Sequence, residues 1–259
     1  MDPFDLYARF YDLDYAGFDD DLQLVQQTAT RCGSPILELG CGTGRLLLPL
    51  AADGFNVTGV DDSVAMLEVA HQKASSRGLG SRVTFVNQNM RELDLGLRYR
   101  LAFAAINSFM HMMTMNDQLA ALKCVRQHLA SDGVLLLDLF NPHPDRLLDC
   151  RGQVVLDKVL TDPDTGLRWM KFIAQTVDLA QQVVHTKLML DQVSEEGRMQ
   201  RTVFAYSLRY IHRIELELLL HRAGFYIEAM YGSYELDEFI GESDKMIAVA
   251  RPLEANSAA

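Results

Sequence analysis

A glycine-rich loop after an apolar run is the feature that most limits how this sequence can fold. The run "ILEL" ends at Leu39, and the next residues, "GCGTG", place glycines at 40, 42 and 44, with Glu38 two positions earlier. Alternating glycines let backbone N–H groups approach a ligand without a Cβ in the way, at a helix N-terminus that favours an anionic group. The stretch predicts a strand, a tight loop and a helix that together bind a nucleotide-like ligand.

The spacing of these glycines argues against a dinucleotide. The G-x-G-x-x-G fingerprint needs a third glycine so that the helix packs closely on the strand. Counted from Gly40 that position is Arg45, and counted from Gly42 it is Leu47. Asp61 follows the next apolar run. A carboxylate there can accept hydrogen bonds from both hydroxyls of a ribose and would repel a 2′-phosphate. We therefore predict a ribonucleoside ligand with a small zwitterionic tail.

Strands and helices alternate along the first half of the chain. Helical periodicity covers residues 20–31, 45–53 (with a kink expected at Pro49) and 116–130, and Ser63 is placed to cap a further helix. Five nearly continuous apolar runs have the composition of parallel strands covered on both faces: "ILEL", "NVTGV", "RVTFV", "LAFAAI" and "VLLLDLF". This order predicts an α/β fold with a Rossmann-like, doubly wound sheet.

The pattern changes after Pro142. Between residues 153 and 209, four β-rich runs are separated by the turn signals "DPDTG", "DLAQQ" and "SEEGR". A helix at 211–223 and the runs "FYIEAMY" and "KMIAVA" then return to the composition of the first half. We predict a core formed by residues 1–150 and 211–252, with residues 151–210 inserted as an antiparallel β meander that covers the substrate site.

Charge and cysteine content limit the partners and the compartment. The chain has 35 acidic and 24 basic residues and a net charge of -11, which repels phosphate backbones and anionic lipids. We expect no nucleic-acid partner, unless another subunit supplies a basic surface, and no membrane. Four cysteines without a CxxC pair, and a start without a signal peptide, favour the cytoplasm. No metal is expected, because His143 and Asp145 lack further clustered ligands.

Five motifs in order resemble those of class I S-adenosylmethionine-dependent methyltransferases: "ILELGCGTGRLLLPLA", "VTGVDDSVAML", "VTFVNQNM", "AINSFMHM" and "DGVLLLDLF". The resemblance covers residues 35–140. It implies a seven-stranded sheet whose last strand is antiparallel, and S-adenosylmethionine as the cofactor. Matching positions imply a set of cofactor-binding residues: Glu38, Gly40, Gly42, Gly44, Asp61, Met66, Asn89, Met90 and Asn107. Asn89 stands where the family usually has an acid that accepts from the adenine amino group, and its amide oxygen can also accept.

The amino-terminal stretch "LYARFYDLDYAGFDDD", the "NSFMHM" motif and the β-rich insertion are similar to small-molecule methyltransferases, among them N-methyltransferases of nucleotide-linked aminosugars. In that comparison Tyr11 lines the methyl-transfer site and His111 faces the acceptor, so these two are the predicted catalytic residues. The simpler alternatives are an aromatic anchor for Tyr11 and a histidine satisfied by a backbone carbonyl for His111. We expect Arg45 to be solvated, and the acidic run 19–21 to be a favourable first helical turn.

The sequence thus predicts methyl transfer from S-adenosylmethionine to an amine or hydroxyl of a small molecule. Such an in-line displacement depends on holding the nucleophile about 3 to 3.5 Å from the methyl group in a dry site. The alternative is a non-catalytic cofactor-binding partner or regulatory protein of the same fold, which only Asn89 favours. A dehydrogenase is disfavoured by Arg45. An oligomer is possible, and the sequence does not predict its form.

Overall fold

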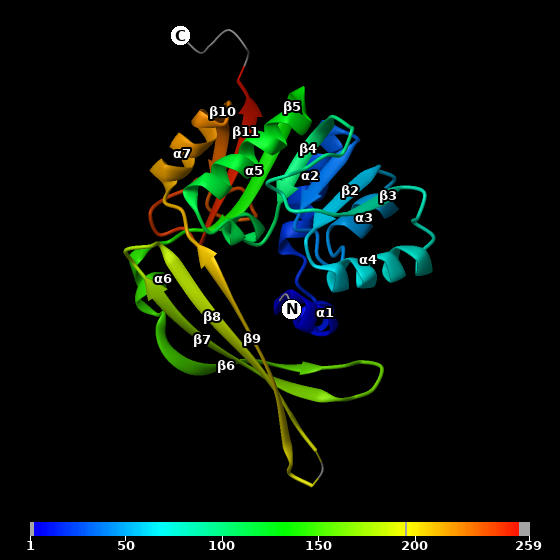
Figure 1. Cartoon of the computed structure of the whole chain (residues 1–259), viewed down its shortest axis with the longest axis vertical. Coiled ribbons are helices and arrows are strands. Elements are labelled where there is room, and N and C mark those ends of the chain that lie inside the picture. Colours follow the sequence, from blue (N-terminus) through cyan, green and yellow to red (C-terminus); the bar gives the residue numbers. More distant parts are fainter. Residues whose placement is uncertain (1–2, 195, 254–259) are drawn as a thin grey trace.

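A seven-stranded sheet forms the centre of the computed structural model, which describes residues 3–194 and 196–253 (Figure 1). The strand order is β10-β11-β5-β4-β1-β2-β3. Its parallel strands are β1 (Ile36–Leu39), β2 (Val57–Asp61), β3 (Val83–Asn87), β4 (Tyr99–Ala104) and β5 (Leu129–Phe140). The last two strands form a hairpin, β10 (Phe225–Tyr231) and β11 (Lys245–Pro252), and β11 runs antiparallel to β5. The predicted doubly wound sheet with an antiparallel last strand is confirmed.

Helices cover both faces of this sheet, which explains why its strands are apolar along their whole length. One face packs on α2 (Asp20–Cys32) and α3 (Leu47–Ala52), through Ile36 and Phe103 among others. The opposite face packs on α5 (Met115–His128) and α7 (Arg213–Arg222) (Figure 1). Neighbouring residues of β1 enter different clusters, with Leu37 on the α5 side, as the alternation of side chains along a strand requires.

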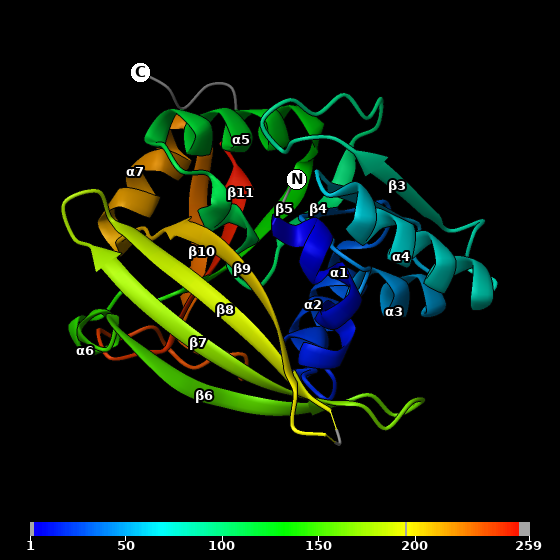
Figure 2. The ribbon, with the colours of Figure 1, turned by 60° about the horizontal axis from the view of Figure 1, so that its bottom comes forward.

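The predicted antiparallel meander is a separate four-stranded sheet after the short helix α6 (Pro144–Leu148). Its strands pair in chain order: β6 (Arg151–Thr161), β7 (Arg168–Asp178), β8 (Val183–Val193) and β9 (Met199–Arg209). Figures 1 and 2 show this sheet extending away from the core, with α7 and the closing hairpin following it in the chain. The insertion leaves the topology of the main sheet intact.

A helix that the sequence analysis did not assign, α1 (Pro3–Asp14), lies between the core and the inserted sheet (Figure 2). Toward the core, Asp12 accepts a hydrogen bond from Lys73 of α4 (Val64–Ser76) at 2.7 Å. Toward the insertion, the Tyr7 ring stacks on Phe204 of β9 with centroids 4.3 Å apart. Because Met66 of α4 joins the same apolar cluster, α1 links both parts of the chain.

Two local predictions around the glycine loop have different outcomes. The Ser63 cap is confirmed, because its hydroxyl accepts from the Met66 N–H at 3.2 Å. The predicted kink in the helix after the loop is wrong: α3 starts only at Leu47, so Pro49 lies in its first turn, where a missing N–H costs nothing. Within the part of the chain that the structure describes, no helix is long and apolar enough to span a membrane.

Candidate active site

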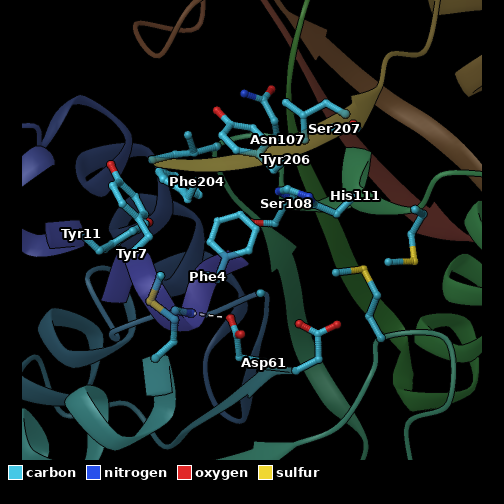
Figure 3. Close-up of a pocket in the computed structure, with 18 of the residues that line it drawn as sticks. Phe4, Tyr7, Tyr11, Asp61, Asn107, Ser108, His111, Phe204, Tyr206 and Ser207 are labelled. Carbon is cyan, nitrogen blue, oxygen red and sulfur yellow. Dashed lines mark hydrogen bonds between the residues drawn. The ribbon is translucent and has the colours of Figure 1, made fainter. Parts of the chain in front are cut away.

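A cavity of about 430 Å³ opens where the carboxyl ends of the core strands meet α1 and the inserted sheet (Figure 3). Ligands of open α/β sheets bind at this edge. The structure brings most of the predicted site residues to the cavity wall: Tyr11, Gly40, Gly42, Asp61, Met66, Asn89, Met90, Asn107 and His111. Glu38 and Gly44 are not part of the wall. The roles of these residues remain predictions.

The loop glycines have positive φ, which L side chains rarely adopt. A Cβ on Gly40 would lie 2.8 Å from the Ser108 Cβ, so this glycine allows the loop and Ser108 to approach each other closely. A Cβ on Gly44 would instead lie 3.1 Å from the Leu48 Cγ, behind the loop. Gly44 therefore allows close packing of the following helix, whereas Gly40 and Gly42 face the cavity.

Asp61 holds the loop and faces the cavity at the end of β2. Its Oδ2 accepts from the Gly42 N–H at 2.7 Å, and its Oδ1 accepts from the Ser63 N–H at 2.9 Å. A carboxylate has about four lone-pair sites, so each oxygen can accept a further hydrogen bond. Binding of the ribose hydroxyls by Asp61 stays a prediction.

Asn89 lines the cavity, but its amide is engaged. Its oxygen accepts from the backbone N–H of Arg91 at 3.1 Å and from the Arg91 Nε at 2.9 Å. Its Nδ2 donates to Asp62, 3.2 Å away. Both lone pairs of the amide oxygen are used, so contact with an adenine amino group would require Arg91 to move. Asp62, which the sequence analysis did not select, also lines the cavity.

Glu38 is buried beneath the loop, and burial raises the pKa of its carboxyl well above the usual range. The Arg45 guanidinium and a hydrogen bond from the Leu47 backbone oppose this shift. Arg45 is not solvated as predicted: it donates to both oxygens of Asp21, with Nη1 2.8 Å from Oδ1. Asp21 lies in the first turn of α2, as predicted, and this pairing explains why it is buried there.

Asn107 precedes the short helix η1 (Ser108–His111) after β4, and His111 is its last residue. Asn107 has φ 65°, and its Oδ1 accepts from the Phe140 N–H at 2.6 Å, which ties η1 to β5. The His111 ring meets the Phe4 ring edge-on, with centroids 5.1 Å apart. Figure 3 shows Phe4, His111 and Tyr206 around the same space, although they come from three distant parts of the chain.

Tyr11 lies on α1 among other tyrosines that line the cavity. Its ring centroid is 6.0 Å from that of Tyr7 and 4.7 Å from that of Tyr15. Burial raises the pKa of Tyr11 to about 12, and the Arg45 charge only partly opposes this shift. Tyr11 is therefore a neutral phenol at physiological pH, which can donate or accept a hydrogen bond but is not ionised.

A buried ion pair, which the sequence analysis missed, adds charge to the cavity wall. Lys171 of β7 places its Nζ 2.6 Å from Oδ2 of Asp14, the last residue of α1, and the Tyr7 hydroxyl donates to the same carboxylate. Asp14, Lys171 and Tyr7 all line the cavity. No local motif signals this pair, because its members come from α1 and the insertion and meet only in the folded chain.

Comparison with known proteins agrees with this arrangement. Residues 36–133 match the family model described as "Methyltransferase domain". The chain is 33% identical over 136 residues to the putative methyltransferase YqeM of Bacillus subtilis (strain 168), covering 51% of this chain and 53% of that protein. The chain thus spans about half the length of the first curated relatives that it matches.

Two further relatives match most of the chain. The cypemycin N-terminal methyltransferase of Streptomyces sp is 25% identical over 217 residues, 84% of this chain and 82% of that protein. Among solved structures, the CcbJ methyltransferase from Streptomyces caelestis is 28% identical with a TM-score of 0.75, covering 91% of this chain and 90% of that chain. Residues 36–133 thus carry a methyltransferase domain, and these two relatives agree with the resemblance that the motifs indicate.

Proposed function

We propose that the whole protein is an S-adenosylmethionine-dependent methyltransferase whose acceptor is the amine of a small molecule. The cavity has two halves with different chemistry. We call the part around Gly40, Gly42, Asp61 and Met66 the cofactor half. The acceptor half is the part between α1 and the inserted sheet, with walls that include Tyr7, Tyr11, His111, Phe204 and Tyr206. A methyl donor in the first half would direct its methyl group toward the second.

The single observation that carries the proposal is that the glycine loop and Asp61 line the same cavity as the aromatic walls of the acceptor half. The volume of about 430 Å³ lies in the range of small-molecule sites. The net charge of -11 disfavours a polyanionic acceptor such as RNA. A small molecule therefore fits the acceptor half better than a nucleic acid.

The choice of an amine rests on the walls of the acceptor half. Aromatic faces attract cations, and the Tyr7, Phe204 and Tyr206 rings are stacked in sequence, with centroids 4.3 and 5.8 Å apart. The carboxylates of Asp61 and Asp62 also line the cavity. A protonated amine is attracted to such a site, whereas a neutral alcohol gains less. The likeness to a protein named as an N-terminal methyltransferase supports the same choice.

Before its nitrogen can attack, a protonated amine must lose a proton. S-adenosylmethionine supplies a methyl group on a sulfonium centre and leaves as the neutral thioether. In the proposal, the imidazole of His111 accepts the proton of the amine, the role of general base that histidine most often takes. Tyr11, held neutral by its raised pKa, orients the amine through its hydroxyl. Phe4 and the inserted sheet exclude water from the acceptor half.

The test is methyl transfer by the purified protein from S-adenosyl-L-[methyl-14C]methionine to matched panels of small amines and alcohols. The proposal expects N-methylated products, identified by mass spectrometry, and little labelling of the alcohols. His111→Gln should lower kcat with an unchanged dissociation constant for S-adenosylhomocysteine. Cofactor binding without transfer to any amine would instead support the non-catalytic alternative. Transfer to alcohols alone would show that the acceptor atom is assigned wrongly.

A further inference from the structure

The polar end of the acceptor half contains one cation. Lys171 is 8% exposed, and among the described residues that line the cavity it is the only lysine or arginine. Its neighbours on the wall include Ile173 and Leu188, which belong to the same inserted sheet. Placing an ammonium group in such surroundings costs desolvation energy, so its presence requires an explanation.

Neutralising Asp14 does not explain Lys171, because a second lysine already pairs with that carboxylate. Lys158 of β6 places its Nζ 2.8 Å from Asp14 Oδ1 and donates to the Asp14 backbone carbonyl at 2.6 Å. The Lys158 side chain is 45% exposed and is not part of the cavity wall. Lys158 thus anchors the end of α1 at lower desolvation cost. The buried Lys171 is available for another task.

The hydrogen bonds of Lys171 leave capacity for a ligand. An ammonium group has three N–H donors. The structure gives Lys171 two carboxylate partners, Asp14 at 2.6 Å and Asp157 at 2.9 Å. These two carboxylates outweigh the effect of burial and raise the pKa of Lys171, so the group stays protonated. One N–H remains for an acceptor atom in the cavity.

We infer that Lys171 binds a neutral oxygen of the acceptor molecule, a hydroxyl, ether or carbonyl, at the end of the acceptor half lined by Tyr7 and Asp14. This inference rests on the proposed function, because it concerns the amine that is methylated there. Lys171 is then a specificity-determining residue: it selects amines that carry an oxygen function at a distance from the nitrogen.

A neutral oxygen fits better than a carboxylate because the charge of Lys171 is already compensated. Asp14 and Asp157 balance Lys158 and Lys171, so these four residues have no net charge. A carboxylate at this point would lie close to the Asp14 carboxylate, and Asp61 and Asp62 add further negative charge to the cavity. A hydroxyl or carbonyl accepts the third N–H without this repulsion.

The experiment uses three amines that differ in one substituent: cyclohexylamine, trans-4-aminocyclohexanol and trans-4-aminocyclohexanecarboxylate. Methyl transfer to each is measured with the full chain under saturating S-adenosylmethionine. The wild-type protein should prefer the aminocyclohexanol in kcat/KM and should accept the carboxylate least. Lys171→Met should reduce this hydroxyl preference about 10- to 100-fold, the range expected for a hydrogen bond to a charged donor, mainly through KM. Lys171→Gln, which keeps a neutral donor, should restore part of it.

Lys158→Met is the matched control, because it also removes one ion pair to Asp14 but leaves the cavity wall unchanged. It should lower thermal stability less than Lys171→Met, because Lys158 is more exposed, and it should keep the hydroxyl preference. If amines are methylated without a preference for the hydroxyl, or if both variants lose this preference equally, the inferred role of Lys171 is wrong. These two outcomes do not count against the proposed function. Failure to methylate any of the three amines counts against the proposed function, and with it against this inference.

Discussion

Replacement of Asp61 by alanine gives the sharpest test of the cofactor half. Asp61 already accepts two backbone N–H groups, at 2.7 and 2.9 Å, which share its charge. We therefore assign each ribose hydroxyl about 1 to 2 kcal/mol, at the lower end for hydrogen bonds to a charged group. Two hydroxyls make about 2 to 4 kcal/mol. Asp61→Ala should weaken cofactor binding by about 30- to 1000-fold.

Loss of affinity alone would not identify the ribose contact, since Asp61→Ala also frees the N–H groups of Gly42 and Ser63. Calorimetry should therefore compare S-adenosylhomocysteine with its 2′,3′-dideoxy analogue on both proteins. In the wild type the analogue should bind about 30- to 1000-fold more weakly, and in Asp61→Ala the two ligands should bind alike. If the variant weakens both ligands equally, Asp61 only shapes the loop and our ribose position is wrong.

Four other substitutions test the surrounding structure. Gly40→Ala and Gly54→Ala both place a side chain at a residue with positive φ, and each should cost about 1 to 3 kcal/mol of stability. Only Gly40→Ala, whose Cβ meets Ser108, should weaken the binding of S-adenosylhomocysteine in calorimetry. The pKa of Glu38 is raised, so its ionisation destabilises the folded state as pH rises. Between about pH 5 and about pH 8, the unfolding free energy of the wild type should fall relative to that of Glu38→Gln. Urea unfolding would refute this if the free energies of the two proteins changed with pH in the same way. Arg45→Met leaves a buried carboxylate unpaired and should cost about 3 to 5 kcal/mol in urea unfolding, whereas a solvated arginine would cost almost nothing.

The sheet could be predicted because each of its determinants is local. Apolar runs, the glycine loop and the Ser63 cap are each encoded within a few residues, and their order fixes the βα topology. The helix α1 also had a local signal, since Tyr7, Phe10 and Tyr11 recur at helical spacing. The acidic and aromatic composition of α1 made this helical periodicity hard to recognise. The buried side chains of α1, such as Tyr7 and Phe10, pack on α4 and on the insertion together, which no amphipathic pattern of the usual kind describes.

The chemistry of the acceptor half could be predicted only in part. Tyr11 and His111 were selected by resemblance, and the structure places both at the cavity. Arg45 and Lys171 depend on partners that are distant in the chain, Asp21 and Asp14, and a charged residue on a predicted helix or strand is more often exposed than buried. The register that brings such partners together is a property of the tertiary fold.

A crystal structure of the protein with S-adenosylhomocysteine bound tests the central claim most directly. Our account predicts the ribose hydroxyls within hydrogen-bonding distance of the Asp61 carboxylate, the amino-acid tail over Gly40 and Gly42, and the sulfur facing Tyr11 and His111. A ligand whose sulfur faces away from the chamber between α1 and the inserted sheet would contradict the account, as would a ligand bound outside this cavity.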